Sequence, residues 1–90
     1  SDYHVSDTNK IVFRQTHSDV LVGFQSGFLT SFVNCTEVDI LGLTGFRGGN
    51  NSLPSSVTTI KVSWPQSAFT VNPSAWGADP NATVIYDYTE

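Results

Sequence analysis

The chain has 90 residues, of which 39% are hydrophobic and 13% are charged, and its formal net charge is −4 at pH 7. A chain of this length builds one small domain with a modest core. Its four lysine and arginine residues are scattered, which argues against nucleic acid and against an anionic membrane surface as partners. No apolar run reaches the ~20 residues that a membrane-spanning helix needs, so we expect no membrane insertion.

The N-terminal quarter is predicted to be irregular. Residues 1–9 show no hydrophobic period and are expected to be a loose lead-in. Residues 10–25 form an irregular first unit, in which Lys10–Arg14 has the alternation of a strand. After a polar turn at 15–19, residues 20–22 are predicted to be either a second short strand or a buried segment that leads into the next unit.

Residues 26–63 are predicted to contain two repeat units with one strand each. Ser26 is placed to cap a short helical turn, and the glycine-rich stretch between the strands favours no regular structure. The predicted elements are, in order, a helical turn at 26–32, a strand at 35–43, a loop at 45–52 and a strand at 57–63.

Residues 64–90 are predicted to be a C-terminal capping unit. Pro65 is tolerated only in a first helical turn, which places one after Ser63. Asn72–Gly77 supplies a cap, a first-turn proline and a C-terminal glycine, which together predict another helical turn. A last strand is expected at 83–88.

The predicted strands echo one another at intervals in the twenties. The segment 38–40 recurs as 60–62, and weaker echoes lie before this pair at 11–13 and after it at 84–86. Such spacings are too long for tight hairpins and predict parallel strands. The predicted fold is therefore a β-rich α+β, short leucine-rich-repeat-like solenoid with parallel strands and short helical turns. The alternative is an all-β sandwich with antiparallel strands, in which the echo would be accidental.

Alternation divides the strand residues between two faces. The predicted inward set is Val38, Ile40, Ile60, Val62, Val84 and Tyr86. The predicted outward set is Glu37, Asp39, Leu41, Thr59, Lys61, Ser63, Thr83, Ile85 and Asp87. Stacking the strands sets lysines beside carboxylates, Lys61 next to Asp39 and Lys10 near Glu37. Cross-strand pairing of these charges is favoured over a catalytic pair of carboxylates.

The segment Phe32–Ile40 resembles the repeat of BspA-like leucine-rich-repeat surface proteins, Phe-x-(Asn/Gly)-Cys-Thr-x-(Leu/Val)-x-(Ile/Val). Leu53–Ile60 is similar to the proline-containing half of the same repeat. Residues 60–86 resemble the closing unit of repeat proteins found in bacterial surface and phage tail proteins. This resemblance implies a non-catalytic binding or adhesion role. The chain departs from the pattern in the glycine-rich loop 45–52 and in its longer first interval.

The leading hypothesis is a binding module of a bacterial surface or phage tail protein, extracellular, at the cell surface or on a virion, that engages a cell-surface protein or glycan. Its candidate binding residues are Glu37, Asp39, Thr59, Lys61, Ser63, Trp64 and Asp87. The tryptophans Trp64 and Trp76 either cap the open end of the core or serve as aromatic anchors. A second hypothesis is a structural virion or surface-assembly domain that packs on sister copies through an exposed strand. A third is a carbohydrate-binding β-sandwich.

An enzymatic role, a metal and a cofactor are not expected. His4 and His17 lie far apart in sequence, and neither has the spacing of a metal site. Cys35, the single cysteine, sits at an inward repeat position and is expected to be a small core residue rather than a nucleophile. No nucleophile, base and orienting group occur together in a recognisable pattern.

Overall fold

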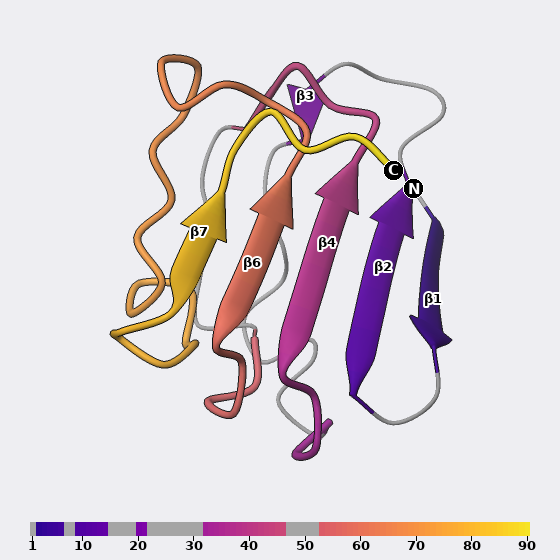
Figure 1. Cartoon of the computed structure of the whole chain (residues 1–90), viewed down its shortest axis with the longest axis vertical. Coiled ribbons are helices and arrows are strands. Elements are labelled where there is room, and N and C mark those ends of the chain that lie inside the picture. The colour runs from indigo at the N-terminus through magenta and orange to yellow at the C-terminus, as the bar shows by residue number, and fades with distance from the viewer. Residues whose placement is uncertain (1, 7–8, 15–19, 22–31, 47–52) are drawn as a thin grey trace.

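The structure is a computed structural model and describes residues 2–6, 9–14, 20–21, 32–46 and 53–90 (Figure 1). The described residues form a five-stranded sheet in the order β1-β2-β4-β6-β7 and a two-stranded sheet of β3 and β5. The strands are β1 (Asp2–Ser6), β2 (Lys10–Arg14), β3 (Val20–Leu21), β4 (Glu37–Leu41), β5 (Gly45–Phe46), β6 (Thr59–Val62) and β7 (Thr83–Ile85).

Strands β2, β4, β6 and β7 run parallel, in the register that the sequence echo predicts. Val38 on β4 pairs with Ile60 on β6, and Ile11 and Val84 extend the same row to β2 and β7. Equivalent positions of successive units therefore lie side by side and present one apolar row to the interior. The antiparallel pairing of a β-sandwich does not describe these four strands.

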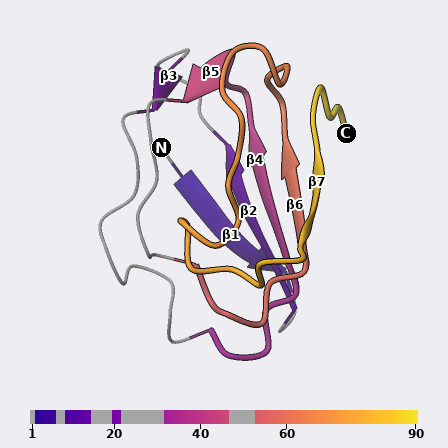
Figure 2. The same cartoon turned by 90° about the vertical axis from the view of Figure 1, so that its left-hand side faces the viewer.

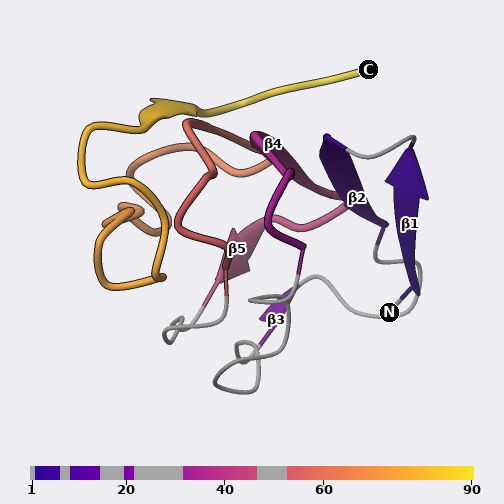
Figure 3. The same cartoon turned by 90° about the horizontal axis from the view of Figure 1, so that it is seen from below.

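The described parts of the connections between the parallel strands lie on one side of the sheet. After β4, Gly42 adopts a positive φ of 80°, which a glycine tolerates, and the chain leaves the sheet toward β5. Figure 2 shows β3, β5 and the 64–82 segment together on this inner side, and the view from below in Figure 3 separates them from the sheet. The opposite, outer face of the sheet carries none of these described segments.

The hydrophobic core fills the space between the inner face of the sheet and these connections. Its buried residues are Ile11, Phe13, Cys35, Val38, Ile40, Leu43, Leu53, Val57, Ile60, Val62, Trp64, Val71, Trp76 and Ala78, with Phe32, Phe69, Val84 and Tyr86 packed against them. The predicted inward set is thus confirmed.

Three aromatic rings close the core beyond β6. The Phe69 ring stacks on Trp76 with centroids 6.3 Å apart and meets Trp64 edge-on at 6.4 Å. The Trp64 Nε1–H donates to the Phe69 carbonyl oxygen at 2.9 Å, so the indole is buried without losing its hydrogen bond. Both tryptophans therefore cap the core, and neither indole ring is exposed to act as an aromatic anchor for a partner.

The helical turns predicted after Ser63 and at Asn72–Gly77 are not helices in the structure. The stretch after Ser63 makes a turn, closed by a hydrogen bond from Ala68 N–H to the Pro65 carbonyl. Residues Asn72–Gly77 form tight turns that end with Gly77 at a φ of 89°. A glycine is favoured at that left-handed position, so Gly77 ends the turn as the sequence predicts. The turn is nevertheless too short to form a helix.

The N-terminal lead-in is more regular than predicted. Asp2–Ser6 is strand β1, which pairs antiparallel with β2. Strand β2 has the predicted bounds. Strands β4 and β6 are shorter at both ends than the predicted 35–43 and 57–63, and β7 starts at Thr83 as predicted but ends earlier. The loop predicted at 45–52 begins with strand β5, which pairs parallel with β3 and so confirms a short strand within 20–22. The turn predicted at 15–19 and most of the helical turn at 26–32 lie outside the described residues.

Candidate functional site

The outer face of the sheet holds the outward set, as alternation predicts, but it is not uniformly open. Asp39 and Leu41 on β4 are only 2% and 6% exposed, although their side chains face away from the core. Glu37, Thr59 and Lys61 are half-buried, and the end positions on β7 are exposed. The expectation of an exposed row is therefore wrong for the central strand, where neighbouring side chains and another segment of the chain provide the cover.

A cluster of four charged side chains lies on this face across the strands β2, β4 and β6; we call Lys10, Glu37, Asp39 and Lys61 the charge cluster. The Lys10 Nζ lies 3.2 Å from Asp39 Oδ2 and 3.4 Å from Glu37 Oε2. The Lys61 Nζ lies 3.2 Å from the same Glu37 oxygen, although Lys61 pairs in register with Asp39. Cross-strand charge pairing is thus confirmed, with Lys61 contacting the diagonal carboxylate.

One oxygen of Asp39 is left without a partner in this cluster. Asp39 Oδ1 is buried and accepts no hydrogen bond within the described part of the chain, and Glu37 Oε2 is held by the two ammonium groups without a directed hydrogen bond. Leaving a carboxylate oxygen unsolvated disfavours its charged form.

The ionisation of the two carboxyls is shifted in opposite directions. Burial, followed by the neighbouring Glu37, raises the pKa of Asp39 to about 6, although Lys10 opposes the shift. Burial alone would raise the pKa of Glu37 as well, but hydrogen bonds from Asp39, Lys61 and Lys10 hold it below its ordinary value. The hydrogen bond to Asp39 raises the pKa of Lys10. One carboxylate and one titratable carboxyl therefore share the site near neutral pH.

We expect Asp39→Asn to flatten the dependence of stability on pH between pH 5 and 7. Because the pKa of Asp39 is higher in the folded than in the unfolded chain, this group stabilises the fold most at low pH, and that contribution is lost as pH rises through about 6. Across this window the loss is about 1 kcal/mol, and asparagine cannot titrate. Glu37 contributes little there, because it is ionised in both states. Urea unfolding at each pH measures the difference in slope.

The matched control is Asp87→Asn, which makes the same chemical change at an exposed side chain. It should leave the slope of the wild-type protein unchanged. A wild-type slope in Asp39→Asn would contradict the assignment of this titration to Asp39.

The C-terminal segment folds back over the outer face; we call Asp87–Glu90 the strap. Strand β7 ends at Ile85, earlier than predicted, because Asp87 turns the chain with a φ of 54°. The Asp87 N–H donates to the Trp64 carbonyl at 3.0 Å, and the Tyr88 N–H donates to the Val62 carbonyl at 2.9 Å. Figures 1 and 3 show the strap crossing the ends of the strands on the outer side.

The far end of the strap is fixed to β2. The Glu90 carboxylate forms a two-pronged ion pair with the Arg14 guanidinium, with Nη2 to Oε2 at 2.6 Å. Between its two ends, Tyr88 lies with its ring centroid 4.8 Å from the Lys61 Nζ. The strap runs from β6 to β2 and must cross β4, where Leu41 pairs in register with Arg14. This crossing explains why an outward leucine is buried.

The remaining candidate residues do not form one site. Thr59 and Asp87 remain at least partly accessible, but Ser63 Oγ donates to the Leu43 carbonyl at 2.7 Å and accepts from the Leu43 N–H at 2.9 Å. Trp64 is fully buried and belongs to the core. The structure thus groups Glu37, Asp39 and Lys61 together and places the others elsewhere. Sequence reasoning paired Lys10 with Glu37 but did not include Lys10, Arg14 or Tyr88 among the candidate site residues. For Arg14, the acidic residues near the C-terminus give only a weak signal.

Cys35 is a core residue, as predicted. Its side chain is 1% exposed, and its Sγ donates to the Glu37 carbonyl at 3.3 Å. Burial raises the pKa of this thiol, so it stays protonated at neutral pH. A buried, protonated thiol is a poor nucleophile.

Comparison with protein-family models, with curated proteins and with solved structures gives no match. Within the described ranges, no three of the histidine, cysteine and acidic side chains gather in a group that could bind a metal ion. The same part of the chain contains no helix with the length and apolar character needed to cross a bilayer.

Proposed function

We propose that this chain is a non-catalytic binding or adhesion module of a bacterial surface or phage tail protein, built as a short leucine-rich-repeat-like solenoid and engaging a cell-surface protein or glycan. The observation that carries the proposal is the parallel, in-register ladder of β2, β4, β6 and β7. Repeat units that stack their strands in this way expose a continuous face, which repeat proteins use for binding.

The surface best suited to a partner lies on the outer side of β6 and β7. The strap and the charge cluster cover the centre of the sheet, whereas Thr83 and Ile85 are exposed and Thr59 is partly so. Ile85 is 39% exposed and offers this surface an aliphatic contact. A mixed row of hydroxyls with one aliphatic side chain is compatible with a glycan or a polar protein surface.

The test is a binding screen of the purified domain against bacterial cell walls and glycan arrays. Any ligand found is then titrated against Ile85→Asp, which is expected to weaken binding at least tenfold, as removal of a central contact does. Val33→Asp is the matched control, because Val33 is 71% exposed, lies in a distant turn and should leave binding unchanged. Equal weakening by both variants, or none by either, would place the binding surface elsewhere.

A second candidate function is assembly with sister copies, and the free edge of β7 favours it. In the described sheet, β7 has a partner only on its β6 side, and residues 82–86 contain no charge, proline or glycine. An uncharged edge strand is a template for pairing with another chain. Size-exclusion chromatography distinguishes the candidates, since an assembling domain elutes well above 9.8 kDa and a monomeric binding module does not.

A further inference from the structure

The backbone groups on the free side of β7 can be identified residue by residue. The Thr83 N–H donates to the carbonyl of Thr58, the residue before β6, at 2.9 Å and so points toward β6. Successive residues of a strand direct their backbone groups to opposite sides. The N–H and carbonyl groups of Val84 and Tyr86 therefore point away from β6, where the described sheet has no further strand. Such groups are a template for an added strand.

A segment on the inner side of the sheet extends past this edge; we call residues 64–82 the ledge. Figures 1 and 3 show the ledge, in orange, reaching beyond β7 on the side away from β6. The Val71 N–H donates to the Tyr86 phenol oxygen at 2.9 Å, which ties the ledge to the end of β7. Residues 64–78 carry no charge. A strand added to β7 would therefore have its inner face sheltered by an uncharged segment.

The ledge restricts which strand of a second copy can reach β7. Two copies that joined their β7 edges in an antiparallel two-fold pair would have their inner faces on the same side. Each ledge extends past its own β7, so the two ledges would compete for the same space. The edge of the second copy that remains is β1.

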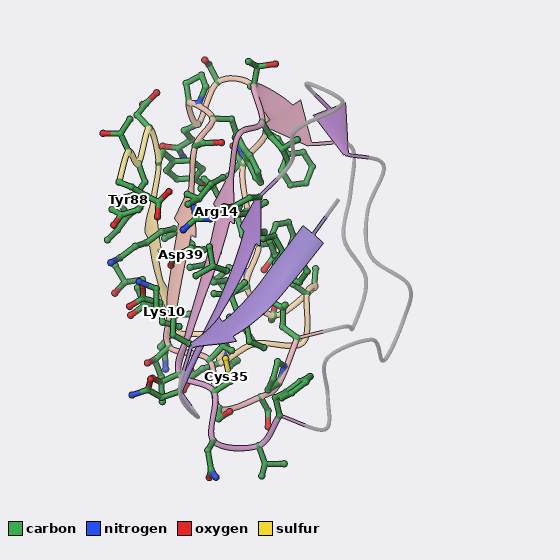
Figure 4. All side chains as sticks on the ribbon, turned by 90° about the vertical axis from the view of Figure 1, so that its right-hand side faces the viewer. Lys10, Arg14, Cys35, Asp39 and Tyr88 are labelled. Atoms are coloured by element: carbon green, nitrogen blue, oxygen red, sulfur yellow. The ribbon has the colours of Figure 1, made fainter. Side chains whose placement is uncertain are left out.

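Strand β1 is available and has the direction that such a contact needs. In the described sheet it has a partner only on its β2 side. Figure 4, which views the molecule from this side, shows β1 in front of the rest of the sheet. Strand β1 runs opposite to β2, and therefore also to β7. A second copy displaced along the sheet thus presents its β1 antiparallel to β7, with both inner faces on the same side.

We propose that copies of this chain assemble head to tail, with the β7 edge of one copy paired antiparallel to β1 of the next. The contact joins two different edges, so every assembly step leaves a free β7 and a free β1, and chains or rings form rather than pairs. The inference rests on the second candidate function, assembly with sister copies, and adds to it which two edges meet. The outer face of the sheet stays accessible in such a chain.

The first test combines sedimentation velocity with amide hydrogen exchange by NMR, from about 10 μM to about 1 mM, the range in which weak contacts form. The average mass should rise from 9.8 kDa past twice this value. The Val84 and Tyr86 amides should exchange freely at the lowest concentration and about tenfold more slowly once about nine-tenths of the edges are paired. The Thr83 amide, which is bonded to Thr58, should be protected throughout and is the internal control.

The second test uses two variants that each block one edge. Thr83→Lys places a charge at an exposed position of β7, and lysine on an edge strand disfavours pairing. On β1, His4→Pro and Val5→Pro each remove one N–H. Because adjacent N–H groups point to opposite sides, one of the two leaves the pairing with β2 intact, and that variant is used.

Each blocked variant alone should stay at 9.8 kDa, because it retains only one kind of free edge. An equal mixture of the two should form a complex of twice this mass and nothing larger, since the free β7 of one variant pairs with the free β1 of the other. The matched control is Thr89→Lys, which makes the same chemical change at an exposed residue of the strap and should assemble like the wild type.

The possible failures are distinguishable. A mass of 9.8 kDa at every concentration would overturn the inference together with the assembly candidate. A rising mass with freely exchanging Val84 and Tyr86 amides would retain assembly but place the contact away from β7. A wild-type mass that stops at twice 9.8 kDa, or a mixture that assembles no further than its components, would mean that β7 does not meet β1. Equal loss in Thr83→Lys and Thr89→Lys would assign the effect to the added charge instead of the edge.

Discussion

Replacing Trp64 by alanine is expected to lower the free energy of unfolding by about 3 to 5 kcal/mol, the upper range for truncation of a core side chain. Trp64 is fully buried at the end of β6, meets Phe69 edge-on and uses its indole N–H to bond the Phe69 carbonyl. Its removal leaves a cavity at the end of the core and takes away the donor that bonds the Phe69 carbonyl. Urea denaturation, followed by circular dichroism, measures the loss.

A graded variant keeps this prediction testable if Trp64→Ala does not fold. Trp64→Phe retains an aromatic ring but removes the hydrogen-bond donor, and it is expected to lose about 1 to 3 kcal/mol. Val33→Ala, at a side chain that is 71% exposed, should change stability by less than about 0.5 kcal/mol. If Trp64→Phe and Val33→Ala proved equally mild, Trp64 would not support the core.

Ile60→Ala should destabilise the domain by about 2 to 5 kcal/mol. Ile60 is fully buried at the centre of the inner face and lies in register between Val38 and Val84. Thr59→Ala, one position along the same strand on the outer face, is the matched comparison and should cost less than about 1 kcal/mol. Chemical denaturation of both variants gives the two values.

The same position also tests the stacking of the units. Because Ile60 and Val38 are paired neighbours on one face, their truncations should not be additive, with a coupling of about 0.5 kcal/mol or more in a double-mutant cycle. Strict additivity, or a loss from Thr59→Ala as large as that from Ile60→Ala, would mean that the two faces of the sheet are assigned the wrong way round.

The sequence predicted the parallel sheet because a repeated apolar pattern constrains register strongly. Shifting β6 by one residue against β4 would turn Ile60 and Val62 out of the core, so the echo with Val38 and Ile40 specifies one pairing. The hairpin of β1 with β2 was missed because Asp2–Ser6 carries two polar ends and no echo. Whether such a segment forms a strand is decided by its pairing with the neighbouring strand rather than by its own residues.

The candidate site was predicted less completely, because the exposure of its residues depends on tertiary contacts. Alternation placed Asp39 on the outer face correctly, but exposure depends on what lies above a strand as well as on which way a side chain points. Lys10 contacts Asp39, and the strap, which lies at the far end of the sequence, crosses β4 at Leu41. A non-repeating segment such as Asp87–Glu90 has no periodic pattern from which its path could be predicted, so its position is seen only in the folded chain.

The burial of Cys35 gives this protein a built-in chemical reporter. The chain has a single thiol, and that thiol is enclosed by the core and protonated, so alkylating reagents should leave the native protein unlabelled. Labelling can occur only in molecules whose core has opened around Cys35, and its rate therefore measures how often this opening occurs. The frequency of such openings can thus be followed by mass spectrometry in the unmodified sequence, without an added probe.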